Sequence, residues 1–278
     1  MNEFSDAAIR ASFDRAARTY DESAVLQRYV ADALLDRFQW LRIDPRVVLD
    51  VGTGTGYALP HLRRRFKKSH VLACDLALGM ACAAHKRRGL WRPSRVFVAD
   101  GHRLPLPSAS VDCIYSSLSL QWMDPARAFP EFLRVLRSGG VFSFSTFGPD
   151  TLKELRAAWA KVDDRPHIHT FMDMHDIGDA LVYAGFADPV LDVEYVTLTY
   201  DTPRAALHDL KQIGAHNAHQ ARFPGLTGKS RYQCFAQNYE AFRRDGRLPV
   251  TYEVVYGQAW FPNATRPGRT IPIKVSQV

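Results

Sequence analysis

The chain has 278 residues, of which 46% are hydrophobic, with a mean hydropathy of -0.22 and a formal net charge of +7. This length suits one large α/β domain with insertions better than two independent domains. No apolar run approaches the roughly 20 residues that cross a bilayer, and the N-terminus lacks the basic and apolar segments of a secretion signal. We therefore expect a single domain over residues 1–278, located in the cytoplasm and not in a membrane.

The four cysteines, at positions 74, 82, 113 and 234, form no C-x-x-C pair. Two of them fall in predicted buried strands, which favours free thiols in a reducing compartment over disulfides or a metal site. The positive charge raises the possibility of an acidic partner. The basic clusters at 63–68 and 86–88 are best explained as solvated helix faces. Neither stacking aromatics nor zinc-ligand spacing accompanies them, so we expect no nucleic-acid partner.

Residues 7–40 carry apolar side chains at helical spacing, with an interruption at 18–23. The pattern predicts two amphipathic helices joined by a turn, which together form an N-terminal helical cap over residues 1–40. Tyr20 lies in that turn. It is either a packing aromatic or a ligand contact, and the residues alone leave both open.

An apolar run at 47–51 is followed by three glycines at alternate positions, Gly52, Gly54 and Gly56. The run is short and bounded by proline and glycine, which is typical of a strand covered on both faces. The glycines allow a ligand to approach the backbone, and helical spacing resumes after them, so that the loop leads to a helix N-terminus. The pattern predicts a nucleotide-type binding loop, although a tight turn would also fit it.

Two cofactor classes compete for such a loop. A dinucleotide fingerprint, G-x-G-x-x-G, would need a glycine at position 57, which is Tyr57. The third glycine is instead Gly56, and Asp50 stands two residues before Gly52. This D-x-G-x-G-x-G pattern resembles the first motif of class I S-adenosylmethionine (SAM) methyltransferases. We therefore expect SAM rather than NAD.

Two further predicted strands end in an acid: 70–75 in Asp75, and 95–101 in Asp100 with Gly101. An acid at the end of the second strand, about 20 residues after the glycine loop, is where a doubly wound fold holds ribose hydroxyls. Asp75 could also cap the next helix. Met80, in that helix, would face the adenine or belong to the core. In the methyltransferase pattern, Asp100 meets the adenine amino group.

The predicted strand at 111–117 places Ser117 and Leu118 at its carboxyl end, where open α/β sheets bind ligands. A helix at 125–136, a stop at 138–140 and a strand at 141–147 follow. Five strand–helix alternations favour a parallel sheet with right-handed crossovers.

Beyond this core the pattern predicts helices at 150–162 and 176–184 and strands at 189–200 and 249–261. The irregular stretch between the two helices contains His167, His169 and His175. We expect no metal there, because neither cysteine nor a spaced third ligand accompanies them. Residues 203–248 are helical in pattern, polar and basic. An insertion this long between two strands is usually functional, and we interpret it as a helical lid.

Several segments together identify a family. They are residues 13–21, 26–28, 31–35, 119–122, 158–167 and 210–215. They resemble the malonyl-acyl-carrier-protein O-methyltransferases of biotin synthesis, and the likeness runs from about residue 9 to about residue 260. The segments at 158–167 and 210–215 are far more specific than the glycine motif. The resemblance implies a Rossmann-like class I methyltransferase: seven mostly parallel strands, helices on both faces, and a helical lid between the last two strands.

The resemblance also implies the reaction, a methyl transfer from SAM to the free carboxylate of a malonyl thioester on acyl carrier protein or coenzyme A, with S-adenosylhomocysteine as the second product. The residues it assigns to cofactor binding are Asp50, Gly52, Thr53, Gly54, Gly56, Asp75, Leu76, Met80, Asp100, Gly101, Ser117 and Leu118. The residues it places around the methyl group are Tyr20, Gln121 and Trp122. Thr53 stands where relatives often have cysteine, a change that we expect to be tolerated.

No catalytic base is expected. A malonyl carboxylate is already ionised at pH 7, as side-chain carboxylates of similar pKa are. The protein must align the oxygen with the methyl group and exclude water. A donor must also hold the other carboxylate oxygen, and the candidates on the insertion are Lys211, His216, Asn217, Arg222 and Arg231. The positive charge of the insertion suits an acidic carrier protein.

Three alternatives stay open. The motifs could serve a SAM enzyme that modifies a protein side chain, like the assembly factors of respiratory complex I. The chain could also bind SAM as a regulatory or scaffold protein without turnover. A dehydrogenase is the third. We expect a monomer.

Overall fold

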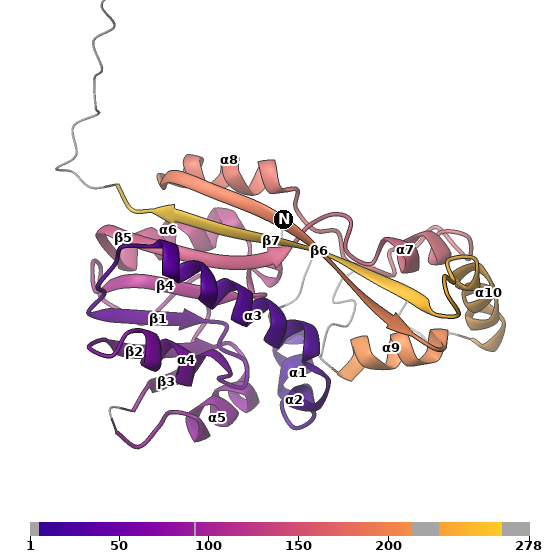
Figure 1. Ribbon diagram of the computed structural model, residues 1–278, viewed down its shortest axis with the longest axis horizontal. Coiled ribbons are helices and arrows are strands. Elements are labelled where there is room, and N and C mark those ends of the chain that lie inside the picture. The colour runs from indigo at the N-terminus through magenta and orange to yellow at the C-terminus, as the bar shows by residue number, and fades with distance from the viewer. Residues whose placement is uncertain (1–5, 92, 213–227, 263–278) are drawn as a thin grey trace, which may run out of the picture.

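The computed structural model describes residues 6–91, 93–212 and 228–262. Seven strands form one sheet in the order β3-β2-β1-β4-β5-β7-β6. Strands β1 to β5 are parallel, β7 is antiparallel to β5, and β6 is antiparallel to β7 (Figure 1). The strands are β1 (Val47–Val51), β2 (His70–Asp75), β3 (Arg95–Val98), β4 (Val111–Ser117), β5 (Leu136–Phe147), β6 (Ala187–Tyr200) and β7 (Leu248–Trp260). The predicted seven-stranded, mostly parallel sheet is confirmed.

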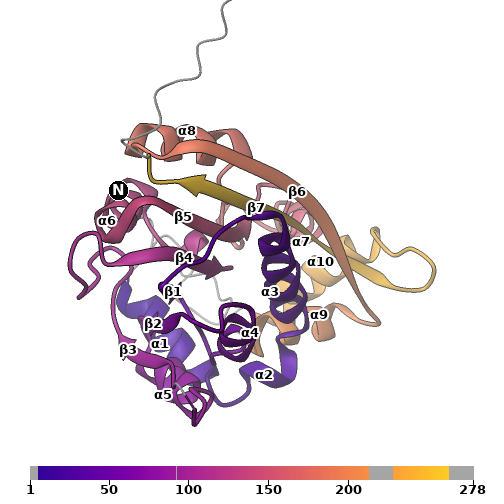
Figure 2. The same ribbon diagram turned by 60° about the vertical axis from the view of Figure 1, so that its left-hand side comes forward.

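Helices cover both faces of the sheet (Figure 2). The α-helices are α1 (Asp6–Ala16), α2 (Tyr20–Ser23), α3 (Val25–Arg37), α4 (Ala58–Arg65), α5 (Leu78–Lys86), α6 (Pro125–Val135), α7 (Lys153–Trp159), α8 (Met174–Ala184), α9 (Pro203–Gln212) and α10 (Lys229–Glu240), and the short 3₁₀ helices are η1 (Phe38–Trp40) and η2 (Leu120–Trp122). One core lies under α3, α4, α7 and α10, and the other lies under α6 and α8. In β1, Val48 faces the first core and Leu49 the second, because side chains alternate along a strand. Both faces of β1 are therefore buried, as predicted.

The boundary between α6 and β5 differs from the prediction. The helix ends at Val135 and the strand begins at once with Leu136, so that the glycine pair lies within the strand. Leu136 pairs with Val111, and Val141 pairs with Cys113. Three extra residues on β5 thus form a bulge, and glycine suits it because Gly139 has a φ of 77°. The glycine pair marks this bulge and not a break between helix and strand.

The N-terminal segment contains the two predicted helices, α1 and α3. The turn between them includes the one-turn helix α2, which begins at Tyr20. Helix α1 is fixed to α5, because Asp14 Oδ1 accepts a 2.7 Å hydrogen bond from the backbone N–H of Gly79. Helix α3 packs into the first core, the one it shares with α4, α7 and α10, through Leu26, Val30 and Leu34. Only α1 and α2 therefore lie over the carboxyl ends of the strands, while α3 packs against the sheet.

The β6–β7 pair extends beyond the other strands and carries α9 and α10 at its far end (Figure 1). Helix α10 packs on α7 through aromatic stacking, since the ring centroids of Phe235 and Trp159 are 4.3 Å apart. On its other face Trp159 stacks on His167, with centroids 4.0 Å apart.

Within the described residues, no helix combines the length and apolar character that a membrane span requires.

Candidate functional site

The glycine loop after β1 needs glycine for two different reasons. All three glycines have positive φ values: 72° for Gly52, 56° for Gly54 and 81° for Gly56. A Cβ on Gly52 would lie 2.3 Å from Cβ of Ser119, and one on Gly56 would lie 2.8 Å from Cα of Ala84. A Cβ on Gly54 would meet no protein atom within 4 Å. Gly52 and Gly56 thus permit close packing, whereas Gly54 faces open space.

Two carboxylates flank this loop. Asp50 is 2% exposed, and its Oδ2 accepts a 2.6 Å hydrogen bond from Thr53 Oγ1. Asp75 Oδ2 accepts a 2.8 Å bond from the Gly54 N–H, and its Oδ1 accepts a 2.9 Å bond from the Ala77 N–H. Burial raises the pKa of Asp50 to about 7 and that of Asp75 to about 6. Both acids are therefore held in place by the loop and the segment that follows β2.

The third acid, Asp100, follows β3. Its Oδ1 accepts a 2.9 Å hydrogen bond from the backbone N–H of His102 and lies 2.7 Å from His102 Nδ1. The other imidazole nitrogen, Nε2, accepts a 2.9 Å bond from the Asp124 N–H. Gly101 lies under Met123, since a Cβ on this glycine would be 2.9 Å from the thioether sulfur.

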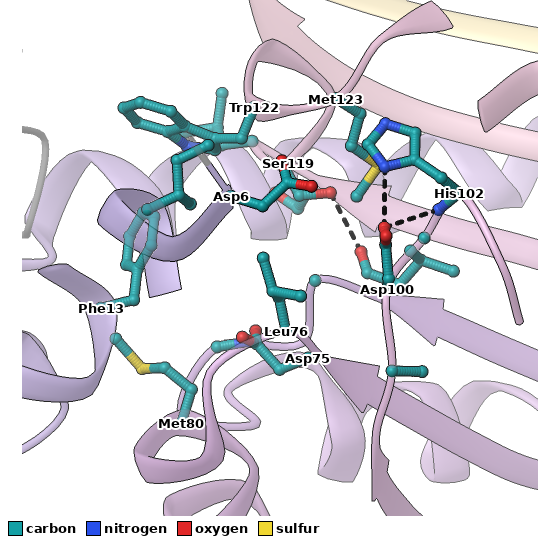
Figure 3. Close-up of a pocket in the computed structure, with 18 of the residues that line it drawn as sticks. Asp6, Phe13, Asp75, Leu76, Met80, Asp100, His102, Ser119, Trp122 and Met123 are labelled. Carbon is teal, nitrogen blue, oxygen red and sulfur yellow. Dashed lines mark hydrogen bonds and ion pairs between the residues drawn. The ribbon is translucent and has the colours of Figure 1, made fainter. Parts of the chain in front are cut away.

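A cavity lies above these acids. Helix α1 closes it through Ile9 and Phe13, and the rings of Phe13 and Trp122 meet edge to face at 5.6 Å. In the view of Figure 3, Phe13 and Trp122 lie across the cavity from Asp100 and His102. The sequence-predicted residues that line it are Tyr20, Gly52, Gly54, Asp75, Leu76, Met80, Asp100, Gly101, Ser117, Leu118 and Trp122.

A second hollow adjoins the first and shares Tyr20, Gly52, Gly54 and Ser117 with it. Asp50 and Thr53 line this second hollow, together with Gln27 and Arg28 of α3. Gln27 Oε1 is buried and has no hydrogen-bond partner among the described residues. Burial raises the pKa of the Tyr20 phenol above its usual range. The two hollows together extend from Asp100 past the glycine loop to α3.

Sequence reasoning had assigned no role to Ile9, Phe13, Gln27, Arg28 or His102. A signal existed for three of them, Phe13, Gln27 and Arg28, because residues 13–21 and 26–28 are among the segments that carry the family resemblance. Nothing in the local sequence distinguishes His102, because the contact that fixes its Nε2, the Asp124 N–H, comes from a segment more than 20 residues away.

Gln121 lines neither hollow. It faces a neighbouring cavity bounded by η2, the end of β5 and residues 169–172. The side-chain Nε2 of Gln121 donates a 2.7 Å hydrogen bond to the Leu118 carbonyl. The backbone carbonyl oxygen of Gln121 lies 3.1 Å from His169 Nε2. His169 also stacks on Trp122, with centroids 6.0 Å apart. Gln121 thus fixes the segment that carries Leu118 and Trp122.

The predicted carboxylate-binding residues lie apart from the cavity or outside the description. Lys211 is exposed on α9. Arg231, on α10, forms an ion pair with Asp163. His216, Asn217 and Arg222 lie outside the described residues. Neither Lys211 nor Arg231 is among the residues that line the two hollows.

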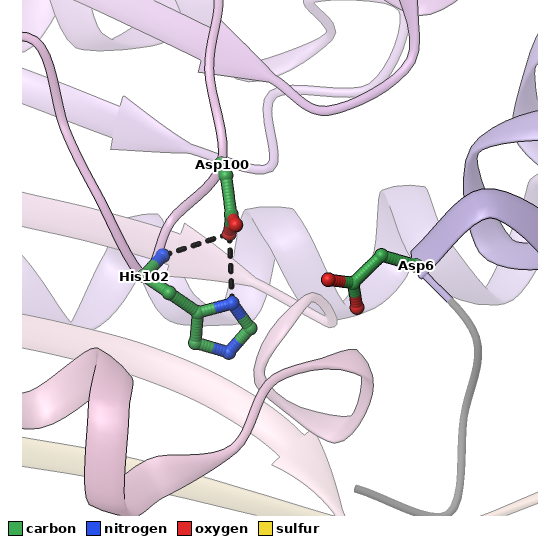
Figure 4. Close-up of side chains that lie close together, drawn as sticks. All are labelled: Asp6, Asp100 and His102. Carbon is green, nitrogen blue, oxygen red and sulfur yellow. Dashed lines mark hydrogen bonds and ion pairs between the residues drawn. The ribbon is translucent and has the colours of Figure 1, made fainter.

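One group of side chains in the described part of the chain has the spacing of metal ligands. Ligand atoms of Asp6, Asp100 and His102 lie within 4.8 Å of one another, and the Asp6 carboxylate points toward the other two (Figure 4). Both imidazole nitrogens of His102 already face protein groups, Asp100 and the Asp124 N–H. The loop histidines do not converge either, since His167 contacts Asp163 and His175 contacts Asp173.

The arrangement fits the expected cofactor. Asp75 and Asp100, which line the cavity, offer the kind of acceptors that ribose hydroxyls and an adenine amino group require. The unpartnered Oε1 of Gln27 and the carboxylate of Asp50 suit the amino group of a methionine moiety, and Arg28 suits its carboxylate. The open side of Gly54 lies between these two ends.

Comparison with known proteins gives consistent results. A model of the methyltransferase domain matches residues 49–144. The malonyl-[acyl-carrier protein] O-methyltransferase of Laribacter hongkongensis is 50% identical over 272 residues, which cover 95% of this chain and 91% of that protein. The protein of the same name from Gallionella capsiferriformans is 47% identical, and 99% of each chain is covered.

Among solved structures, the Haemonchus contortus phosphoethanolamine N-methyltransferase 2, in complex with phosphomonomethylethanolamine and S-adenosylhomocysteine, is similar with a TM-score of 0.54. It shares 17% sequence identity, and the match covers 90% of this chain and 58% of the other. At this identity the likeness shows the fold alone.

Proposed function

The chain belongs to the malonyl-[acyl-carrier protein] O-methyltransferase family, and from that premise we propose that it methylates the free carboxylate of a malonyl thioester carried by acyl carrier protein. The observation that carries the proposal is the identity of 50% and 47% to two relatives of that name over nearly the whole chain. SAM is the methyl donor. The product, a malonyl methyl ester, would prime the synthesis of the pimelate part of biotin.

The residues that would hold SAM follow from the two hollows. We assign the adenine to Asp100 and Gly101, with Leu76 and Met80 beside it, and the ribose to Asp75. Asp50 and Gln27 would hold the methionine amino group and Arg28 its carboxylate, while Ser117 and Leu118 border the middle. Gly52, Thr53, Gly54 and Gly56 shape the loop between these ends. Bound SAM supplies an electrophilic methyl group on a sulfonium.

The protein's own task is positioning. The substrate carboxylate is ionised at pH 7 and needs no base. Consistent with this, burial raises the pKa of the Tyr20 phenol, which keeps its proton and is not an ionised base; it can pack, and it can donate or accept a hydrogen bond. Tyr20 and Trp122, with Phe13 against the indole, would exclude water from the reacting atoms. Gln121 would hold the Leu118–Trp122 segment in place through its bond to the Leu118 carbonyl.

The far end of the β6–β7 pair, with α9 and α10, is called the β6–β7 arm here. The substrate would enter from the side of this arm. We propose that residues 203–248 form a lid and residues 1–40 a cap on one domain that acts as a monomer. Lys211 on α9 is the described candidate for the second oxygen of the malonyl carboxylate. Arg231 is less suited to that role because it already pairs with Asp163. Exposed basic side chains on this arm would attract the acidic carrier protein before contact.

Mass spectrometry of malonyl-acyl carrier protein after incubation with the enzyme and SAM tests the proposal. We expect a gain of one methyl group that an esterase removes, and no gain on acetyl-acyl carrier protein, which lacks the free carboxylate. Binding of S-adenosylhomocysteine without any methyl transfer would instead favour a regulatory role. Methylation or hydroxylation of a protein side chain would favour a protein-modifying enzyme.

We also propose that the protein works in the cytoplasm. Its four cysteines are free thiols, as is usual in a reducing compartment.

A further inference from the structure

The acid at the adenine end of the cavity is held by a buried histidine. The His102 side chain is 3% exposed, whereas that of Asp100 is 34% exposed and lines the cavity. His102 approaches one oxygen of Asp100, Oδ1, twice: through its backbone N–H at 2.9 Å and through Nδ1 at 2.7 Å. The Nδ1 contact is an electrostatic one and not a straight hydrogen bond. Asp100 Oδ2 makes no hydrogen bond within the described part of the chain.

The protonation of the imidazole ring follows from its other nitrogen. Nε2 lies 2.9 Å from the Asp124 backbone N–H, which can only donate. A neutral imidazole has one donor nitrogen and one acceptor nitrogen. Because Nε2 must accept, the proton is on Nδ1 and faces Asp100. The backbone at the start of α6 therefore selects the tautomer of His102, in the way that a hydrogen bond to one ring nitrogen fixes the role of the other.

This geometry has a consequence for the ligand. His102 holds Oδ1 of Asp100 through one backbone hydrogen bond and the 2.7 Å contact of Nδ1. Asp100 lines the cavity, and its Oδ2 is left as the acceptor without a hydrogen bond to the described residues. An acceptor at this point favours a base whose edge carries an amino group and disfavours one that carries a carbonyl oxygen, since two acceptors would then face each other unpaired. The side chain that fixes this choice is His102, which also lines the cavity but whose two ring nitrogens face Asp100 and the Asp124 N–H.

We propose that His102 is a positioning residue that orients Asp100 and so gives the site its preference for adenine over hypoxanthine in the cofactor. This inference rests on the proposed SAM-dependent function. It differs from that function in naming a specificity determinant that acts through another residue.

Asp6 offers a rival account. Its carboxylate comes from the first turn of α1 and lies within 4.8 Å of both Asp100 and His102. If Asp6 were the acceptor for the amino group, His102 would matter little to the choice of base. Asp6→Asn is therefore a matched control, because it removes a neighbouring acid and leaves the His102–Asp100–Asp124 contacts in place.

Calorimetry with S-adenosylhomocysteine and S-inosylhomocysteine tests the proposal. The two ligands differ only in the purine substituent, so the ratio of their dissociation constants on one protein is insensitive to a general loss of folding. We expect the wild type to prefer S-adenosylhomocysteine by about 10- to 100-fold, which corresponds to the cost of leaving one hydrogen-bonding group unpaired. In His102→Phe the ratio should fall below about 5-fold.

Two amide variants sharpen the test. Asparagine can place its NH₂ group near the position of Nδ1, whereas glutamine places it near that of Nε2. His102→Asn should therefore keep most of the preference, and His102→Gln should lose it. This pair decides the question even if His102→Phe does not fold.

Three results would overturn the proposal. The first is an unchanged preference in both His102→Phe and His102→Gln. The second is loss of preference in Asp6→Asn with its retention in the His102 variants, which would assign the role to Asp6. The third is a wild type that binds neither ligand, which would refute the proposed function as well. Normal binding and selectivity in the wild type with no effect of His102 would refute this inference alone.

Discussion

The indole of Trp159 stacks on the imidazole of His167 with the ring centroids 4.0 Å apart and the planes 9° from parallel. His167 in turn contacts Asp163, which pairs with Arg231 on α10. These hydrogen bonds, acting against burial, hold the pKa of Asp163 well below its usual range. Residues 158–167, one of the two more specific segments in the family resemblance, therefore join α7 to α10. In the described structure they fix the far end of the β6–β7 pair.

Replacing Trp159 should destabilise the protein. The side chain is 8% exposed and lies between His167 and Phe235. Trp159→Ala should lower the free energy of unfolding by about 3 kcal/mol, the lower end for a buried tryptophan. Urea denaturation measures this change. Trp91→Ala is the control, because Trp91 is 93% exposed and its loss should have an effect within about 0.5 kcal/mol. Equal effects of the two substitutions would refute the role of Trp159 in joining α7 to α10.

The glycine loop provides a second comparison. A Cβ on Gly52 would lie 2.3 Å from Ser119, whereas one on Gly54 would meet no protein atom within 4 Å. Gly52→Ala should therefore reduce thermal stability strongly. Gly54→Ala should cost about 1 kcal/mol from its left-handed backbone, yet it should weaken binding of S-adenosylhomocysteine at least about 10-fold by filling cofactor space. Unimpaired binding by Gly54→Ala would contradict the placement of the cofactor.

The sequence predicted the parts of the fold that local patterns encode. The run Val47–Val51 and the glycines after it identified β1 and the loop, because burial on both faces and positive φ both leave a signature in adjacent residues. Asp75 was found in the same way, from its place at the end of a strand. The contact of His102 with Asp124 joins segments that no periodicity relates, so it could only be seen in the structure. Likewise, the periodicity of α3 indicates only packing for Gln27, whose unpartnered Oε1 is seen only in the structure; the family resemblance marked residues 26–28 without assigning them a role.

Binding of the adenosine part should depend on pH through Asp75. Burial raises the pKa of Asp75 to about 6, and the ionised form is the better acceptor for ribose hydroxyls. Affinity is therefore full above this pKa and falls as pH drops through it. 5′-Methylthioadenosine, which lacks the amino-acid part held near Asp50, should bind up to about 10-fold more weakly at about pH 5 than at about pH 8. Asp75→Asn should bind weakly at both pH values, and a pH dependence that persists in this variant would exclude Asp75 as its source.

Charge reversal separates steering of the carrier protein from binding of the carboxylate. Lys229→Glu on α10 should lower kcat/KM for malonyl-acyl carrier protein about 5-fold at low salt and less at high salt. It should change kcat/KM for malonyl-coenzyme A little. Lys211→Glu should lower kcat/KM for both substrates if Lys211 holds the malonyl carboxylate. Lys68→Glu is the control, because Lys68 is exposed and lies between α4 and β2, away from the β6–β7 side of the sheet. An equal loss in that variant would point to net charge alone.

The most direct test of the central claim identifies the atom that receives the methyl group. The enzyme is incubated with malonyl-acyl carrier protein and SAM labelled with ¹³C in the methyl group, and the product is observed by NMR. We expect one new methyl signal at the chemical shift of a carboxylic methyl ester, absent when acetyl-acyl carrier protein replaces the substrate. A label that stays on sulfur, or that appears as an N-methyl or C-methyl signal, would contradict carboxylate O-methylation.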